Sequence, residues 1–249
     1  RLTDVTGVQT CALPISNVLG GVPRPARLTM AQFDEAMKRG LALVDTRDKL
    51  AFAGGHYPGS LNIQDNGAFS TWAGWMLEYN RPFVLVAAES RMDELTRALI
   101  RIGLDDIAGY VTDMDRIGDA GHDMRVMEQI TVEELHAHLG HYHVLDVRGA
   151  TEHEAVRIPG ARNVHAGLLG GHLDTIPRDR TVVVHCVSGD RSSIATSYLL
   201  SQGFRNVRNL TCGFNGWLQH GYTTEHGSTT NPGASGGRGE ATERSAAAA

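Results

Sequence analysis

The chain has 249 residues, 20% of them charged, and a formal net charge of −5 at neutral pH. This length allows one large or two modest domains, the charge offers no basic surface to nucleic acid or an acidic membrane, and no apolar stretch approaches the roughly 18–20 residues of a membrane span. Three cysteines are too few for a disulfide scaffold, which favours a reducing, cytoplasmic setting.

Residues 1–27 are expected to be a non-native leader followed by a linker. The stretch VTGVQTCALPI at 5–15 resembles the translation of a common sequencing-adapter oligonucleotide, and a segment of that origin is excluded from fold reasoning. It lacks the continuous apolar run of a signal peptide. On this interpretation Cys11 has no biological role, and the native chain extends upstream of Asn17.

The region 28–111 predicts alternating helices and short apolar strands. Thr29 and Gln32 form a capping box, which marks the start of a helix. The elements expected after that helix are a strand at 43–47, a Pro-Gly turn at 57–62, a strand at 83–86, a helix at 95–103 and a strand at 107–111.

The region 130–222 repeats this order of elements about one hundred residues later. Thr131 and Glu134 form its capping box. Short strands alternating with helices indicate α/β domains, each with a parallel sheet that has helices on both faces. The matching elements are a strand at 144–148, a Pro-Gly turn at 158–163, a strand at 181–184, a helix at 193–203 and a strand at 207–210.

Two segments outside the repeats are expected to lack a domain structure of their own. The stretch 112–129 is polar and rich in Asp, Gly and Met, and we interpret it as the linker between the domains. Residues 223–249 are rich in Gly, Ser, Thr and Ala. They cannot bury enough apolar surface to offset their ordering entropy, so a disordered tail is expected.

Cys186 is the strongest candidate for a catalytic residue. It ends the apolar run 182–185 and opens the loop Cys186–Ser192, after which a helix is expected. A helix N-terminus, a guanidinium and inward-pointing N–H groups all stabilise a thiolate, and Gly189 lets the loop curl. Arg191 can neutralise a bound anion, so Cys186 and Arg191 are the expected catalytic pair. The expected substrate-binding and persulfide-binding residues are the rest of the loop: Val187, Ser188, Gly189, Asp190 and Ser192.

This loop and the order of elements resemble those of rhodaneses, sulfurtransferases that carry sulfur as a cysteine persulfide. The resemblance covers roughly 28–111 and 130–222. In phosphatases with a similar cysteine loop, the loop sequence resembles the pattern C-x5-R, because that loop wraps a phosphate group. Four residues separate Cys186 from Arg191 here, and the tighter ring suits one extra sulfur atom better.

The first domain is expected to be catalytically silent. Where the second has Cys186, the first has Ala87–Glu94, without cysteine and with carboxylates that repel an anionic ligand. We expect it to pack against the active domain and shape one wall of the site, or alternatively to bind a partner domain. The Asp-x-Arg sequence recurs in both copies. Recurrence without a nucleophile gives Asp146 and Arg148 a supporting role.

The histidines near position 140 do not predict a metal site. Their spacing approaches the metal motif H-x-H-x-D-H, but Gly140 replaces the aspartate and the segment lies at a helix end. A solvated helix end is therefore expected, with no metal ligands in the chain. The histidines concerned are His136, His138, His141 and His143.

Cys212 and three tryptophans have simpler interpretations. Cys212 stands where rhodanese domains usually have glycine; a small buried residue is expected, and a resolving thiol for Cys186 is the alternative. Trp217 is expected in the core. Trp72 and Trp75 share one helical face and are expected to pack in the core or between the domains.

The segments 69–75 and 81–87 resemble the first rhodanese copy of proteins that begin with a metallo-β-lactamase-fold domain. Such proteins look like persulfide dioxygenase–sulfurtransferase fusions. The resemblance implies that residues 17–25 form a linker from an upstream domain of that fold, a possible partner, and that any dioxygenase activity belongs there.

The expected function is sulfur transfer from thiosulfate or a persulfide to a thiol or cyanide, without a cofactor in this chain. The expected partners are the small-molecule donor and acceptor. One alternative is a cysteine-loop phosphatase or arsenate-reductase-like enzyme. The other is a non-catalytic tandem that docks to an upstream domain, which predicts an exposed apolar patch around Trp72 and Trp75.

Overall fold

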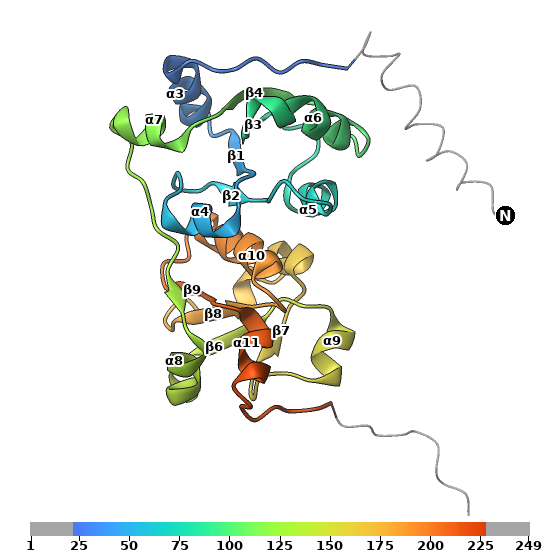
Figure 1. The fold of residues 1–249 in the computed structure, drawn as a ribbon, viewed down its shortest axis with the longest axis vertical. Coiled ribbons are helices and arrows are strands. Elements are labelled where there is room, and N and C mark those ends of the chain that lie inside the picture. Colours follow the sequence, from blue (N-terminus) through green and yellow to red (C-terminus); the bar gives the residue numbers. More distant parts are fainter. Residues whose placement is uncertain (1–21, 228–249) are drawn as a thin grey trace, which may run out of the picture.

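The structure is a computed structural model that describes residues 22–227. The adapter-like stretch 5–15 with Cys11, and residues 228–249 of the predicted tail, lie outside this part of the chain. Within it, two α/β domains follow one another, each built on a parallel sheet (Figure 1). The predicted fold class is confirmed. None of the described helices is long and apolar enough to cross a membrane.

The first domain has a four-stranded sheet in the order β2-β1-β3-β4. Its strands are β1 (Ala42–Asp45), β2 (Leu61–Asn62), β3 (Phe83–Val86) and β4 (Ile107–Val111). Its helices are α3 (Met30–Lys38), α4 (Lys49–Gly54), α5 (Phe69–Met76), the 3-10 turn η1 (Glu89–Arg91), α6 (Met92–Ile100) and α7 (Met114–Asp119).

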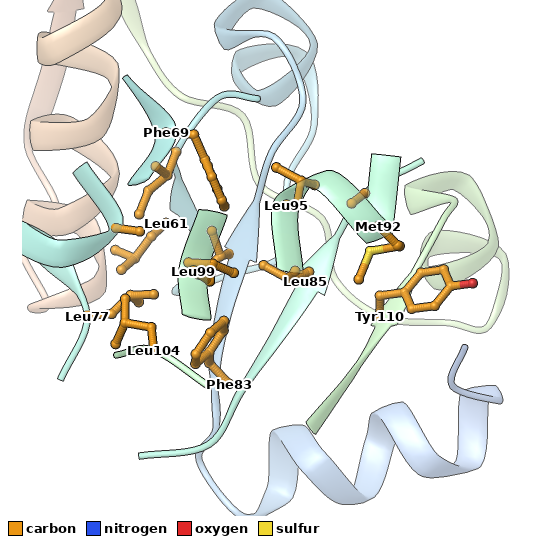
Figure 2. Packing of buried hydrophobic residues seen from close by; sticks show 14 residues of the cluster. Leu61, Phe69, Leu77, Phe83, Leu85, Met92, Leu95, Leu99, Leu104 and Tyr110 are labelled. Atoms are coloured by element: carbon orange, nitrogen blue, oxygen red, sulfur yellow. The ribbon is translucent and has the colours of Figure 1, made fainter. Parts of the chain in front are cut away.

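Strand β3 shows why both faces of this sheet are covered. All four of its side chains are buried, and they alternate between two clusters. Phe83 and Leu85 join the cluster formed with α5 and α6 (Figure 2). Val84 and Val86 join the cluster formed with α3 and α7. Helices therefore lie on both faces, as the sequence predicts.

The second domain has a five-stranded sheet in the order β5-β9-β8-β6-β7. Its strands are β5 (Gln129–Ile130), β6 (His143–Asp146), β7 (Arg162–Asn163), β8 (Val182–His185) and β9 (Val207–Leu210). Its α-helices are α8 (Val132–Ala137), α9 (Ala150–Ala155), α10 (Asp190–Ser201) and α11 (Gly213–Gln219). Three 3-10 turns complete it: η2 (Leu139–His141), η3 (Ala166–Gly171) and η4 (Leu173–Thr175).

The segment predicted as a linker, 112–129, is only partly a linker. It contains α7, whose Met114 and Ile117 are buried against the first sheet. Asp113 caps this helix by accepting a hydrogen bond from the N–H of Asp115 (2.9 Å). Gln129 already belongs to β5. The segment is polar overall because so short a helix needs only two apolar residues to face the sheet.

The predicted disordered tail begins too early. Glu225 pairs with Arg157 in an antiparallel bridge, and the N–H of Gly227 donates to the carbonyl of Glu154 (2.7 Å). The indole of Trp217 donates to the carbonyl of Thr223 (2.9 Å). Residues 223–227 are therefore ordered. Composition did not show this, because backbone groups make most of these contacts.

Each domain contains the same hydrogen-bonded frame around its Asp-x-Arg sequence. Arg148 donates to both carboxylate oxygens of Asp146 and to the carbonyl of Val156, at 2.6–3.1 Å. The amide of Asn163 donates to the carbonyls of Asp146 (2.8 Å) and Arg148 (2.9 Å). The first domain repeats the whole frame with Asp45, Arg47, Gly55 and Asn62. The frame therefore serves the fold of either copy.

Helix α10 joins the two domains. It lies between the two sheets and contacts β2 of the first domain (Figure 1). The hydroxyl of Ser193 donates to the side-chain oxygen of Asn62 (2.7 Å), and the N–H of Asn62 donates to the hydroxyl of Ser197 (3.0 Å). These groups are buried, so the joint fixes the first domain against the helix that follows the cysteine loop.

Two tryptophans of α5 complete the joint. The ring of Trp72 stacks on His165 of the second domain at 5.9 Å, and Trp75 meets His165 edge-on at 5.7 Å. Trp75 also covers Gly167, where a Cβ atom would lie 2.5 Å from the indole. The prediction of interdomain packing is confirmed, although half of Trp75 stays exposed.

Breaking the frame of the first domain should lower its stability. Arg47→Met leaves the Asp45 carboxylate, which is fully buried, without its cation. We expect the free energy of unfolding to fall by about 3 kcal/mol, as is usual when one partner of a buried ion pair is removed. Arg97→Met breaks the exposed pair with Asp93, and its expected cost is much smaller, because solvent screens exposed ion pairs. Urea unfolding measures both, and equal costs would contradict this role of the frame.

Candidate active site

Cys186 lies directly after β8, at the carboxyl edge of the second sheet. Its side chain is buried, with 1% exposed, and its Sγ accepts a hydrogen bond from the N–H of Gly189 (3.2 Å). Gly189 has φ +103°, a left-handed conformation that other residues rarely adopt. It caps α10, and no side chain occupies the cap, so first-turn N–H groups remain available to a ligand. The predicted cysteine loop therefore meets a helix N-terminus.

The start of α11 supports the loop from the other side. The N–H of Phe214 donates to the carbonyl of Cys186 (2.8 Å), and that of Asn215 donates to the carbonyl of Val187 (3.1 Å). At Gly213, φ is +55° and a Cβ atom would lie 2.7 Å from both carbonyl oxygens. Only glycine fits there. These two hydrogen bonds were not predicted from the sequence, and Gly213 was the one residue that could have indicated them.

The predicted supporting residues, Asp146 and Arg148, act on the cysteine loop indirectly, by way of α11. The guanidinium of Arg148 lies over the ring of Phe214, 4.3 Å from its centroid. Asp146 holds Arg148 and also accepts from Nδ1 of His153 (2.9 Å). Burial raises the pKa of Asp146, but the hydrogen bonds from Arg148 and His153 outweigh this and bring it down to about 2. Asp146 is therefore a carboxylate at neutral pH.

Arg191 is held beside the loop by Glu152. Its two terminal nitrogens donate to the two carboxylate oxygens, at 2.7 and 2.9 Å. The hydrogen bond from Arg191 lowers the pKa of Glu152 to about 2, and the N–H of Gly149 adds to the shift. A guanidinium has five N–H groups, so three remain free of this pair. Glu152 was not predicted as a site residue. The sequence feature that could have indicated it is its position three residues after the N-cap of α9.

Residues of the first domain form part of the site. Lys49 donates to the carbonyl of Ser188 (3.0 Å) and to the carboxylate of Asp190 (2.7 Å). Gln64 donates to the same carboxylate (3.3 Å). A cavity of about 280 Å³ opens over the cysteine. Its lining comes from both domains: Gln64, Asn66, Ala68 and Trp72 from the first, and Cys186, Ser188, Asp190, Arg191 and Ile194 from the second.

Three predicted loop residues do not line this cavity: Val187, Gly189 and Ser192. The carbonyl of Val187 is turned to α11, where Asn215 binds it. Ser192 lies in the first turn of α10 and is fully buried. Its hydroxyl has no hydrogen-bond partner among residues 22–227.

Cys212 is not buried, which corrects the prediction. It is exposed, and it adopts the left-handed conformation at φ +59°. The position therefore has the backbone of the glycine that rhodanese domains usually carry, but its side chain points to solvent. Trp217, by contrast, is 1% exposed, and its predicted place in the core is confirmed.

Three of the four histidines near position 140, His136, His138 and His141, lie where α8 ends and η2 follows, and His143 is the first residue of β6. His136 stacks on Tyr222 (3.8 Å between ring centroids), and His138 stacks on His141 (5.7 Å). Over residues 22–227, no three His, Cys, Asp or Glu side chains group closely enough to hold a metal ion. The helix-end interpretation fits His136, His138 and His141, but His143 is a half-buried residue of β6.

The family model of the rhodanese-like domain matches residues 29–119 and again residues 131–220. The chain therefore belongs to the rhodanese-like family and carries two copies of its domain. The first match ends where α7 ends, which agrees with the domain limit found in the structure.

Individual relatives match mostly one copy. A sulfurtransferase of Allochromatium vinosum is 38% identical over 78 residues, 31% of this chain and 73% of that protein. A rhodanese-related protein from Thermoplasma volcanium is 28% identical, with a TM-score of 0.38, over 39% of this chain and 97% of its own. The thiosulfate sulfurtransferase of Pseudomonas aeruginosa is 24% identical, with a TM-score of 0.37, over 82% of this chain and 44% of its own.

His185, directly before the cysteine, predicts a pH dependence of stability. Complete burial lowers its pKa to about 4, and its Nε2 has no partner within residues 22–227. In the unfolded chain His185 has a pKa near 6.5 and takes up a proton below that pH, whereas in the folded chain it stays neutral until about pH 4. Stability therefore falls as the pH drops from about 6.5 toward 4, by up to about 1.4 kcal/mol per pH unit. The groups facing His185 are Asp146, Arg148 and His153.

His185→Gln removes this titration. We expect the variant to lose about 2 kcal/mol less stability than the wild type between pH 6.5 and pH 4.5. The window lies above the range in which Asp146, with its pKa of about 2, takes up a proton. Urea unfolding at both pH values gives the difference. Parallel losses in the two proteins would show that His185 does not titrate there.

Proposed function

We propose that the protein is a sulfurtransferase that carries sulfane sulfur as a persulfide on Cys186. The observation that carries this proposal is the hydrogen bond from Gly189 to Sγ at the N-terminus of α10. A buried sulfur that faces backbone N–H groups is stabilised as a thiolate, and the same groups can hold the charged outer sulfur of a persulfide. The family of the chain and its sulfurtransferase relative support this chemistry.

In the first half-reaction, the Cys186 thiolate attacks the outer sulfur of thiosulfate or of an organic persulfide. A new S–S bond forms to Sγ, the donor's own S–S bond breaks, and sulfite or a thiolate leaves with the electron pair. The free N–H groups of Arg191 are available to donate hydrogen bonds to the anionic donor and leaving group. The amide of Gly189 and the first-turn N–H groups of α10 are the donors available to the outer sulfur.

In the second half-reaction, a thiolate or cyanide attacks the outer sulfur of the Cys186 persulfide. The S–S bond to Sγ breaks, its electron pair returns to Cys186, and a persulfide or thiocyanate leaves. No cofactor enters this cycle. A reducing, cytoplasmic setting keeps Cys186 available as a thiol and is part of the proposal.

The cavity supports small-molecule donors and acceptors. Its volume of about 280 Å³ exceeds what thiosulfate needs, and Trp72 and Ile194 offer apolar walls to an organic thiol. The docking alternative is less well supported. Trp72 and Trp75 both contact His165 of the second domain, so these side chains already take part in the joint between the domains, although half of Trp75 stays exposed.

Cys186→Ser should abolish the transfer. After incubation with thiosulfate and removal of the small molecules, intact-mass measurement is expected to show the gain of one sulfur atom on the wild type and none on the variant. Cys212→Ser is the matched control and should keep the full gain. A wild type without the added sulfur would refute the proposal, and Cys186-dependent hydrolysis of an aryl phosphate would favour the phosphatase alternative.

We further propose that the native protein includes an upstream metallo-β-lactamase-fold domain. The support is the resemblance of 69–75 and 81–87 to the first rhodanese copy of persulfide dioxygenase fusions. Any dioxygenase activity would belong to that domain. Sequencing the uninterrupted upstream reading frame is expected to show H-x-H-x-D-H, and a frame that lacks it would contradict this proposal.

A further inference from the structure

Lys49 is a residue of the silent domain that reaches the cysteine loop of the other domain. It is the first residue of α4, and its side chain is only 25% exposed. Its Nζ donates to the carbonyl of Ser188 (3.0 Å) and to the carboxylate of Asp190 (2.7 Å). These two residues flank Gly189, whose N–H faces the sulfur of Cys186. The lysine thus holds both neighbours of the sulfur-binding amide.

The contact is close, and the side chain is well placed for it. A Cβ atom on Gly189 would lie 3.5–3.6 Å from the end of the Lys49 side chain. The N–H of Lys49 donates to the side-chain oxygen of Gln64 (3.0 Å), and the amide nitrogen of Gln64 donates to Asp190 (3.3 Å). Lys49 and Gln64 therefore hold one another and converge on the same carboxylate.

The contact that Lys49 of the first domain makes with the cysteine loop of the second has no counterpart from the second domain to the first. Lys49 lies four residues after Asp45 at the end of β1, and the corresponding residue after Asp146 in the second domain is Ala150. Lys38 and Lys49 are the only lysines of the sequence. The silent domain thus offers a cation at a position where the cysteine-bearing domain has a methyl group.

The charge of Lys49 matters as well as its position. Burial raises the pKa of Asp190, but hydrogen bonds from Lys49 and Gln64 outweigh this and bring it below its usual value. Asp190 is therefore charged, and it stands in the first turn of α10 beside the thiol. An unpaired carboxylate there would oppose both the Cys186 thiolate and an anionic donor. Lys49 neutralises it.

We propose that Lys49 of the silent domain is a positioning residue of the Cys186 loop, so that the chemistry of the second domain depends on the first. Lys49 fixes the Ser188 carbonyl so that the Gly189 N–H faces the sulfur, and it cancels the charge of Asp190. The inference rests on the proposed function, which it deepens by assigning a task to the domain without a cysteine.

The test uses the full chain with Cys11→Ser and Cys212→Ser, so that Cys186 is the single thiol. Two quantities are measured: the pH at which iodoacetamide alkylates Cys186 at half its maximal rate, and kcat/KM for thiosulfate. Lys49→Met is expected to move the alkylation midpoint up by about one pH unit and to lower kcat/KM about tenfold. Lys38→Met is the matched control, expected to equal the parent in both.

Two further variants separate position from folding. Lys49→Arg keeps the cation and should restore most of the alkylation midpoint and of kcat/KM. Lys49→Gln keeps a hydrogen-bond donor for Ser188 without the charge, and should fall between the parent and Lys49→Met. Both remain informative if Lys49→Met folds poorly, which its urea midpoint would show.

Alkylation needs no sulfur donor, so the inference and the proposed function fail separately. An alkylation midpoint in Lys49→Met and Lys49→Gln equal to that of Lys38→Met would overturn the role of Lys49, whatever the transfer rate. A parent protein that does not transfer sulfur would refute the proposed function alone. An alkylation midpoint that shifts in Lys49→Met and returns toward the parent value in Lys49→Arg would establish the positioning role of Lys49, whether or not the parent transfers sulfur.

Discussion

The sulfur of Cys186 is buried where β8 ends and α10 begins, and the second domain is arranged around that point. The loop between strand and helix is short, so Gly189 must take a left-handed conformation to turn its N–H toward Sγ. Neighbouring elements then hold the loop in place. Helix α11 binds the carbonyl of Cys186 from below, and Glu152 of α9 holds Arg191 beside the loop.

The two domains show which parts of this scaffold belong to the fold and which to the chemistry. Both have the Asp-x-Arg frame with its asparagine, because that frame joins the end of one strand to the turn that leads to the next. Only the second has a cysteine, followed by a helix with an open cap. The first instead presents Lys49, Gln64 and Trp72 to its neighbour. The site is therefore a joint product of both domains.

Much of this architecture could be predicted from the sequence. The helix caps at Thr29 and Thr131, the alternating buried strands and the Asp-x-Arg repeat together indicate two parallel sheets with covered faces. The cysteine loop follows from its position between a strand and a helix. Helix α7 escaped prediction because two apolar side chains in a polar segment suffice for its burial. Contacts between the domains join residues that are far apart in the chain. Lys49 and Asp190 are separated by 141 positions, and no local sequence pattern indicates that they meet.

The central claim is that sulfur is carried on Cys186, in a cradle made by the start of α10. A crystal structure of the thiosulfate-treated protein tests it most directly. We expect one extra sulfur atom bonded to Sγ of Cys186, within hydrogen-bonding distance of the Gly189 N–H and of further donors of the first turn, with Arg191 still paired to Glu152. An unmodified Cys186, or an added sulfur on Cys212 instead, would contradict it.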